Sequence, residues 1–179
     1  MNFTDYAKYN RKGYQAFKVE ENFYRVIDKL GEPDGKNLLV SVTIRLKNKV
    51  NGIPTDWIIA NSASNAFEFK ISRKFWGRKS KYMKLPYISA IESSKGWDKE
   101  HIHALVVLKD LKQHYEPTEI EKEVRKIALS LEEVNSNTPD SVITASMPYY
   151  EDKNKELGNR IEYICKSSSK QYNPLARKV

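Results

Sequence analysis

Four short segments of the chain have the composition of β-strands, and two helical patterns lie between them in a fixed order. The segments are rich in apolar and β-branched residues, and they are LLVSVTIRL (38–46), LPYISAIE (85–92), HIHALVVL (101–108) and SVITASM (141–147). One helical pattern separates the first strand from the second, and the other separates the third strand from the fourth. The predicted order is strand, helix, strand, strand, helix, strand, and it restricts the fold more than any other feature.

The first helix has recognisable sequence signals at both ends. NGIPTD (51–56) predicts a turn, after which Thr55 or Asp56 can cap a helix that runs to about Trp76. Gly77 is placed to end this helix, because glycine tolerates the backbone angles of a helix C-terminus.

The rest of the pattern completes a known arrangement of strands and helices. SSKGWDKE (93–100) has the composition of a hairpin connection, and the second helix is expected to open at Pro117 and Thr118, with Thr118 and Glu121 in the spacing of a capping box. A last helix is predicted over residues 155–170. This order is typical of the α+β ferredoxin-like (RRM-like) fold, a β-α-β-β-α-β or split βαβ pattern, here with an additional C-terminal helix. It predicts an antiparallel sheet with helices over one face and the other face available for a ligand.

The length of 179 residues predicts one domain with a hydrophobic core of its own. We expect a single domain over residues 1–179, with its core at about 38–170, an arm and short helix in 1–37, and a basic tail at 171–179. The single cysteine, Cys165, excludes an internal disulfide and a cysteine-based zinc site. The sequence has no long apolar run and no secretory signal pattern, so we expect an intracellular, cytoplasmic protein without membrane contact.

Two of the three histidines stand in one predicted strand, at positions 101 and 103. Side chains alternate across a strand, so His101 and His103 point to the same face and can bind one metal ion. Glu92 ends the strand before the hairpin and is the favoured third ligand, whereas Glu100 ranks second because alternation places it on the other face. The alternative interpretation is a pair of half-exposed histidines bonded to their neighbours and a solvated carboxylate.

The predicted last helix places a tyrosine on its polar side. With 100° per residue, Tyr163 lies in a largely basic stripe with Lys166 and Lys170, opposite the apolar arc. A tyrosine that served only the core would join the apolar arc. The alternative is a half-exposed tyrosine and two solvated lysines.

Together these motifs resemble those of a nuclease family. HIH (101–103), followed by an apolar strand, resembles the histidine–hydrophobe–histidine motif of HUH endonucleases. YICK (163–166) resembles the Tyr-x-x-Lys motif of the replication initiator (Rep) branch of that superfamily. Glu92 stands where many Rep proteins carry a third metal ligand, and VSVTIRL (40–46) is similar in position to the family's first motif.

The resemblance implies a metal-dependent, site-specific endonuclease and strand transferase that initiates rolling-circle replication of a plasmid or virus. Tyr163 would attack the scissile phosphate to give a 5′-phosphotyrosine, and Lys166 would stabilise the phenolate or position the phosphate. His101, His103 and Glu92 would hold a divalent metal, Mn²⁺ or Mg²⁺ by family analogy, although Zn²⁺ could also bind. The expected partners are single-stranded or hairpin origin DNA and a host helicase.

Two alternatives stay open from the sequence. A single-tyrosine transposase or a relaxase would keep the same chemistry, although relaxases usually carry a third histidine and His114 lies outside the predicted strand. The position of Lys166, three residues after Tyr163, favours the Rep branch. The other alternative is a ferredoxin-like module that binds nucleic acid without catalysis.

The formal net charge of +8 points to a polyanionic partner, and many of the basic residues cluster in one segment. KISRKFWGRKSKYMK (70–84) has no acidic residue, and it leads into the predicted strand that ends in Glu92, so we expect it to border the metal site. We expect Phe75 and Trp76 to pack inward. The predicted DNA-binding residues are Lys70, Arg73, Lys74, Arg78, Lys79, Lys81 and Lys84, together with Lys170 near the C-terminus.

Overall fold

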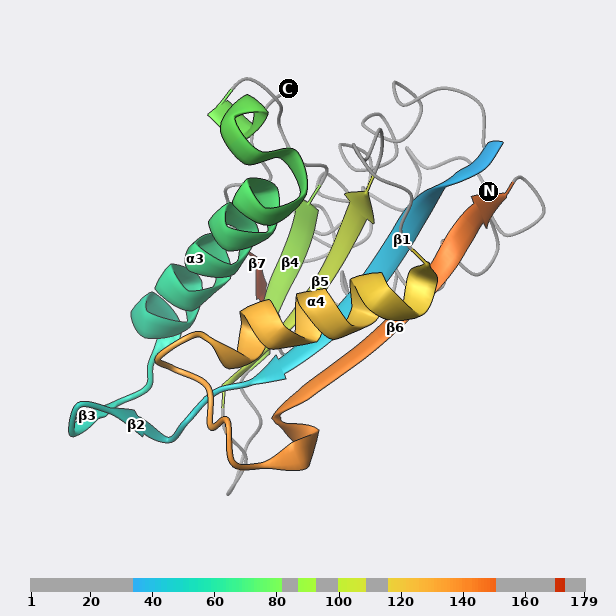
Figure 1. Cartoon of the computed structure of the whole chain (residues 1–179). Helices are drawn as coiled ribbons and strands as arrows, with labels where there is room; N and C mark the ends of the chain where they lie inside the picture. Colours follow the sequence, from blue (N-terminus) through green and yellow to red (C-terminus); the bar gives the residue numbers. More distant parts are fainter. Residues whose placement is uncertain (1–33, 82–86, 93–99, 109–115, 151–169, 173–179) are drawn as a thin grey trace, which may run out of the picture.

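The computed structural model describes residues 34–81, 87–92, 100–108, 116–150 and 170–172 (Figure 1). Its elements are β1 (Asp34–Arg45), β2 (Lys49–Val50), β3 (Ile53–Pro54), α3 (Trp57–Trp76), the 3-10 helix η1 (Gly77–Lys81), β4 (Tyr87–Glu92), β5 (His101–Leu108), α4 (Pro117–Leu129), the 3-10 helix η2 (Pro139–Ser141), β6 (Val142–Tyr150) and β7 (Lys170–Tyr172). The predicted α+β class, with an antiparallel sheet and two helices, is confirmed. None of the helices in these ranges combines the length and apolar character that a membrane span requires.

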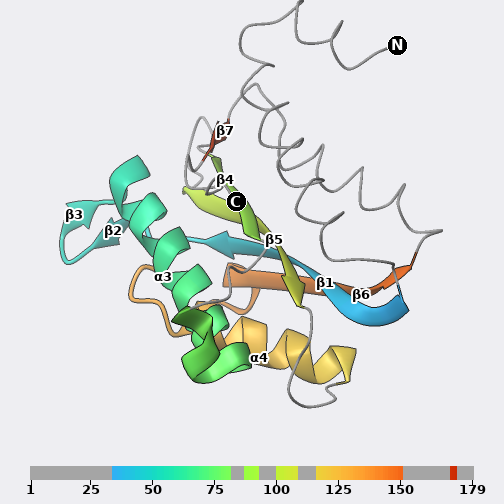
Figure 2. The same ribbon diagram turned by 90° about the horizontal axis from the view of Figure 1, so that it is seen from above.

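The main sheet has the strand order β6-β1-β5-β4-β7, and all neighbouring strands are antiparallel. Strand β1 pairs with the central strand β5 from Leu38 opposite Leu108 to Arg45 opposite His101. Figure 2 shows α3 and α4 on the same side of this sheet. Strands that are distant in the sequence are therefore neighbours, and one end of β1 lies beside the start of β5.

The core lies between the sheet and the two helices. Alternate residues of β1 and β5 face the helices, as strand periodicity requires. The buried cluster includes Val40, Val42 and Ile44 from β1, Ile102, Ala104 and Val106 from β5, Phe67 and Ile71 from α3, and Ile120 and Val124 from α4. The predicted helix-facing side of HIHALVVL is therefore confirmed, and His101 and His103 are on the opposite face.

That opposite face is buried along part of its length, contrary to the prediction of a face open to ligand. Leu39 and Val107 are each 1% exposed and Leu105 is 0% exposed, and alternation places all three away from the helices. Every residue of β5 after His103 is apolar, a pattern typical of a strand buried on both faces. Thr43 and Arg45, two polar residues of β1 on this face, lie toward the end where His101 begins β5.

The observed ends of β1 and α3 agree only in part with the ends predicted from the sequence. β1 begins at Asp34 and not at residue 38, and its pairing with β6 shifts register between Asp34 and Leu38. Asp56 caps α3, because its Oδ1 accepts a hydrogen bond from the Ile59 backbone N–H at 2.9 Å. Gly77 ends α3 with a positive φ of 58°, as expected.

The predicted capping box of the second helix is wrong by two residues. Glu116 is the N-cap, and its backbone N–H donates to the Glu119 carboxylate at 3.2 Å. The physical reason is Pro117, which occupies the first helical position and favours an extended conformation at the residue before it. Glu121 instead accepts a hydrogen bond from the Ser146 backbone N–H at 2.8 Å and links α4 to β6.

Other predictions fall on the C-terminal and N-terminal parts of the chain. Lys170 was expected to end the last helix, but it begins β7, which pairs with β4. Three serines directly precede it, and serine competes with the helix for backbone hydrogen bonds. The remainder of the predicted last helix (155–169) and the N-terminal arm (1–33) lie outside the described residues.

Candidate metal centre

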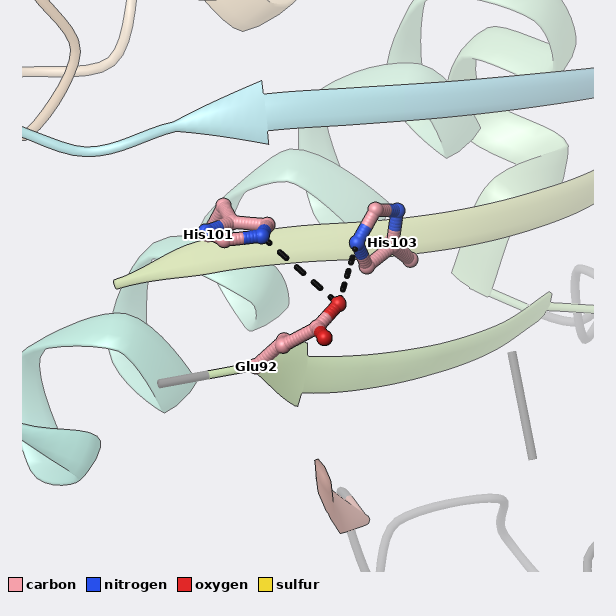
Figure 3. Close-up of side chains that lie close together, drawn as sticks. All are labelled: Glu92, His101 and His103. Atoms are coloured by element: carbon pink, nitrogen blue, oxygen red, sulfur yellow. Dashed lines mark hydrogen bonds and ion pairs between the residues drawn. The ribbon is translucent and has the colours of Figure 1, made fainter. Parts of the chain in front are cut away.

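A carboxylate and two imidazoles meet where β4 ends and β5 begins. Glu92 is the last residue of β4 and His101 the first residue of β5, and the antiparallel register places them opposite each other. His103 is two residues further along β5, on the same face. Figure 3 shows all three side chains converging on one point. The two strands thus bring together the three residues predicted as metal ligands.

The ligand atoms of this cluster lie within 4.8 Å of one another. Glu92 Oε2 is 2.9 Å from His103 Nε2, with which it forms a hydrogen bond, and 3.6 Å from His101 Nε2. The two imidazole rings meet edge to face, with centroids 5.1 Å apart. The His103 side chain is 8% exposed, against 21% for His101 and 24% for Glu92. The cluster therefore has a buried end at His103 and a solvent-accessible end.

These residues fit a divalent metal ion. Ligand atoms bound to one ion at about 2.0–2.2 Å must lie roughly 3–3.5 Å apart, and the two carboxylate–imidazole separations are close to this range. Two imidazoles and one carboxylate suit transition metals, and three protein ligands leave coordination positions for water or substrate. The group is therefore close enough together to bind a metal ion.

His103, the most buried residue of the cluster, has a further partner on β1 that was not predicted from the sequence. Thr43 lies opposite His103 in the β1–β5 pairing, and its Oγ1 is 3.1 Å from His103 Nδ1, within hydrogen-bonding distance. If His103 binds a metal through Nε2, its Nδ1 carries the proton and donates to the Thr43 hydroxyl. Thr43 therefore holds the ring in the orientation that a ligand needs. The alternation of polar and apolar residues in VSVTIR puts Thr43 on a polar face, but nothing local indicates its partner.

The competing carboxylate, Glu100, does not belong to the cluster among the described residues. Its backbone carbonyl accepts a hydrogen bond from the Leu46 N–H at 3.0 Å, and it directly precedes the first residue of β5. The ranking of Glu92 before Glu100 agrees with this arrangement.

The described part of the basic segment, residues 70–81, does not lie beside Glu92. It begins in α3 and continues through η1, which leads toward the start of β4, whereas Glu92 ends that strand about 17 Å further on. Figure 1 shows the end of α3 and the arrowhead of β1 at opposite ends of the sheet. As expected, Phe75 and Trp76 pack inward, with exposures of 3% and 4%.

Two lysines of this segment have partners in or next to α4. Lys70 Nζ donates to the Ser130 carbonyl and hydroxyl at 3.0 Å each, and Lys74 Nζ pairs with the Glu123 carboxylate at 2.8 Å. This hydrogen bond lowers the pKa of Glu123. DNA contact by these lysines stays a prediction.

The remaining predicted site residues lie on α3, η1 and β7 or fall outside the described residues. Arg73 and Arg78 are exposed, on α3 and η1 respectively. Lys79 and Lys81 are in η1, and Lys170 is opposite Glu92 in the β4–β7 pairing. Tyr163, Lys166 and Lys84 lie outside the described residues.

Comparison of the chain with protein-family models, with curated proteins and with solved structures finds no match. The cluster and the strands that carry it are therefore the basis for assigning a function.

Proposed function

We propose that this chain is a metal-dependent endonuclease and strand transferase of the HUH superfamily, which nicks single-stranded DNA and remains covalently attached to it. The biological role proposed is initiation of rolling-circle replication of a plasmid or virus, on single-stranded or hairpin origin DNA. The observation that carries the proposal is the cluster of Glu92, His101 and His103, whose ligand atoms all lie within 4.8 Å of one another.

The strand pairing supports the finer fold assignment. β5 lies between β1 and β4, the two strands that α3 connects, and β1 lies between β5 and β6, the two strands that α4 connects. Two interleaved βαβ units of this kind make the split βαβ arrangement of ferredoxin-like folds. We assign the chain to that fold, with the cluster where β4 ends and β5 begins.

A metal bound by the cluster, for which we propose Mn²⁺ or Mg²⁺, would polarise the scissile phosphate and neutralise the charge that develops on it. The carboxylate and the two neutral imidazoles supply one ligand atom each and leave further positions for phosphate oxygens. Thr43 fixes the ring of His103, and His103 is the most buried of the three ligands.

Tyr163 is the proposed nucleophile. Its phenolic oxygen forms a bond to phosphorus as the bond from phosphorus to the 3′ oxygen breaks, and the leaving oxygen takes up a proton to give a free 3′-hydroxyl. Lys166 stabilises the phenolate during the attack. Lys170 lies opposite Glu92 in the β4–β7 pairing, and the seven residue steps from Tyr163 to Lys170 span at most about 25 Å when extended, so Tyr163 is within chain reach of the cluster.

The test is capture of the covalent intermediate. The chain is incubated with Mn²⁺ and a labelled pool of single-stranded oligonucleotides of random sequence, and adducts are separated on a denaturing gel. Wild type and Tyr149→Phe should form an adduct, and Tyr163→Phe should not. An adduct of Tyr163→Phe at the wild-type level would refute the assignment of the nucleophile.

The metal ligands are tested separately. His103→Ala should abolish cleavage while much of the affinity for single-stranded DNA remains, because phosphate contacts by basic residues do not require the metal. Undiminished cleavage by His103→Ala would remove this residue from the mechanism. If wild type binds single-stranded DNA but forms no adduct with any metal tried, the chain is a nucleic-acid-binding module and not a nuclease.

A further inference from the structure

Arg45 ends β1 on the same face of the sheet as the metal cluster. Its two chain neighbours, Ile44 and Leu46, are buried in the core beneath the helices, so Arg45 points to the other face. Thr43, two residues earlier on that face, contacts His103. The Arg45 side chain is exposed.

The strand register puts Arg45 beside the metal ligands. Arg45 is directly opposite His101 in the β1–β5 pairing, and His101 is directly opposite Glu92 in the β5–β4 pairing. The three residues therefore form one row across three adjacent strands. Opposed residues in antiparallel strands have Cβ atoms about 4.5–5.5 Å apart, so the long arginine side chain can reach a ligand held at the cluster.

The charge of Arg45 is not neutralised within the described part of the chain, where no ion pair joins it to a carboxylate. Two other basic side chains, by contrast, have partners in the described part of the chain. Lys47 Nζ donates to the Glu132 carbonyl at 2.6 Å, and Lys74 pairs with the Glu123 carboxylate. Arg45 is thus an exposed cation beside an acidic ligand group. A guanidinium in this position has no evident role in packing.

We propose that Arg45 is a phosphate-binding residue, whose guanidinium contacts the non-bridging oxygens of the DNA phosphate held at the cluster. The inference rests on the proposed function and adds a substrate contact to it. The planar guanidinium fork matches two oxygens of one phosphate, and a fixed positive charge stabilises the extra negative charge of the transition state. A lysine at this position would keep the charge and lose the paired geometry.

The test compares Arg45→Ala and Arg45→Lys with wild type and with Lys122→Ala, a charge-matched control that removes an exposed lysine of α4 on the helix side. Fluorescence anisotropy measures binding of labelled oligo(dT) in Mn²⁺ over a range of salt concentrations. Arg45→Ala should bind roughly tenfold to hundredfold more weakly, and the slope of log affinity against log salt should fall by about 0.7, the value for one lost phosphate contact. Lys122→Ala should match wild type.

Rates of adduct formation from the random oligonucleotide pool complete the experiment. Arg45→Ala should lose rate beyond its loss of affinity, and Arg45→Lys should retain the salt slope but recover only part of the rate. Unchanged affinity, slope and rate in Arg45→Ala, with an active wild type, would overturn the role of Arg45 and leave the nuclease proposal intact. If wild type forms no adduct but Arg45→Ala still loses affinity and slope, the phosphate contact stands and the nuclease proposal fails. No binding of oligo(dT) by wild type would overturn both.

Discussion

Substitution Thr43→Val removes one hydroxyl next to the proposed metal centre and keeps the branched shape of the side chain. Thr43 Oγ1 lies 3.1 Å from His103 Nδ1, and His103 Nε2 faces Glu92 and the metal position. Without the hydroxyl, the Nδ1–H of a metal-bound His103 has no acceptor from β1. We expect the variant to bind divalent metal more weakly while the fold is retained.

The size of the effect follows from the burial of the ring. The His103 side chain is only 8% exposed, so water has little access to replace the lost partner. Loss of such an outer hydrogen bond typically weakens metal binding about tenfold to hundredfold. This corresponds to about 1.4–2.8 kcal/mol, and the upper part of the range is expected because the ring is nearly buried.

Isothermal titration of the apo chain with Mn²⁺ measures this affinity directly. Thr43→Ser is the matched control, since it keeps the hydroxyl and loses a methyl group, and it should bind within a fewfold of wild type. Thermal unfolding in EDTA should show that Thr43→Val is folded. Equal Mn²⁺ affinity of Thr43→Val and wild type would refute the orienting role. An equal loss in Thr43→Ser and Thr43→Val would show that packing, and not the hydroxyl, is responsible.

Three further predictions concern stability and are measured by urea denaturation. Asp56→Ala should lower the free energy of unfolding by about 0.5–2 kcal/mol, because the Ile59 N–H loses its cap; no loss would contradict this. Gly77→Ala should cost about 1–3 kcal/mol through its φ of 58° alone, since an added Cβ meets no atom within 4 Å; a neutral effect would refute the strain. Tyr87→Phe should cost about 1 kcal/mol, because its buried hydroxyl lies 2.9 Å from Ser64 Oγ and burial raises the pKa of Tyr87; equal stability would show that the Ser64 bond contributes nothing.

The cluster of Glu92, His101 and His103 could be predicted because the three residues lie close together in the sequence. His101 and His103 share a face of one strand by alternation alone, and Glu92 ends the preceding strand. A hairpin joins these strands, and in an antiparallel hairpin residues at equal distances from the turn lie opposite each other. The observed pairs, Glu92 with His101 and Ala90 with His103, follow that symmetry. Local sequence was sufficient for this part of the site.

The contributions of β1 could not be predicted in the same way. Thr43 and Arg45 precede their partners His103 and His101 by 60 and 56 residues, and β2, β3, α3, η1 and β4 lie between them. No short turn relates the two strands, so their register depends on packing of the whole core. A shift of one residue would turn both polar side chains into the core and Ile44 out of it. The sequence shows that β1 has a polar face, and the fold decides what that face touches.

Two lysines of the basic segment 70–84 lie away from the metal cluster and have partners in or next to α4. Lys70 and Lys74 are adjacent on one helical face, and that face meets α4, where Ser130 and Glu123 hold their ammonium groups. Their charges therefore act between the two helices, on the side of the sheet away from the cluster. Arg45 has only two basic residues close to it in sequence, but its register sets it beside His101, with Glu92 on the next strand beyond. Salt largely screens exposed charges that are more than about 10 Å apart, so a cation close to the cluster would act most strongly on a phosphate bound there. The position of a cation relative to the metal ligands thus decides its role, and in this chain the pairing of β1 with β5 determines that position.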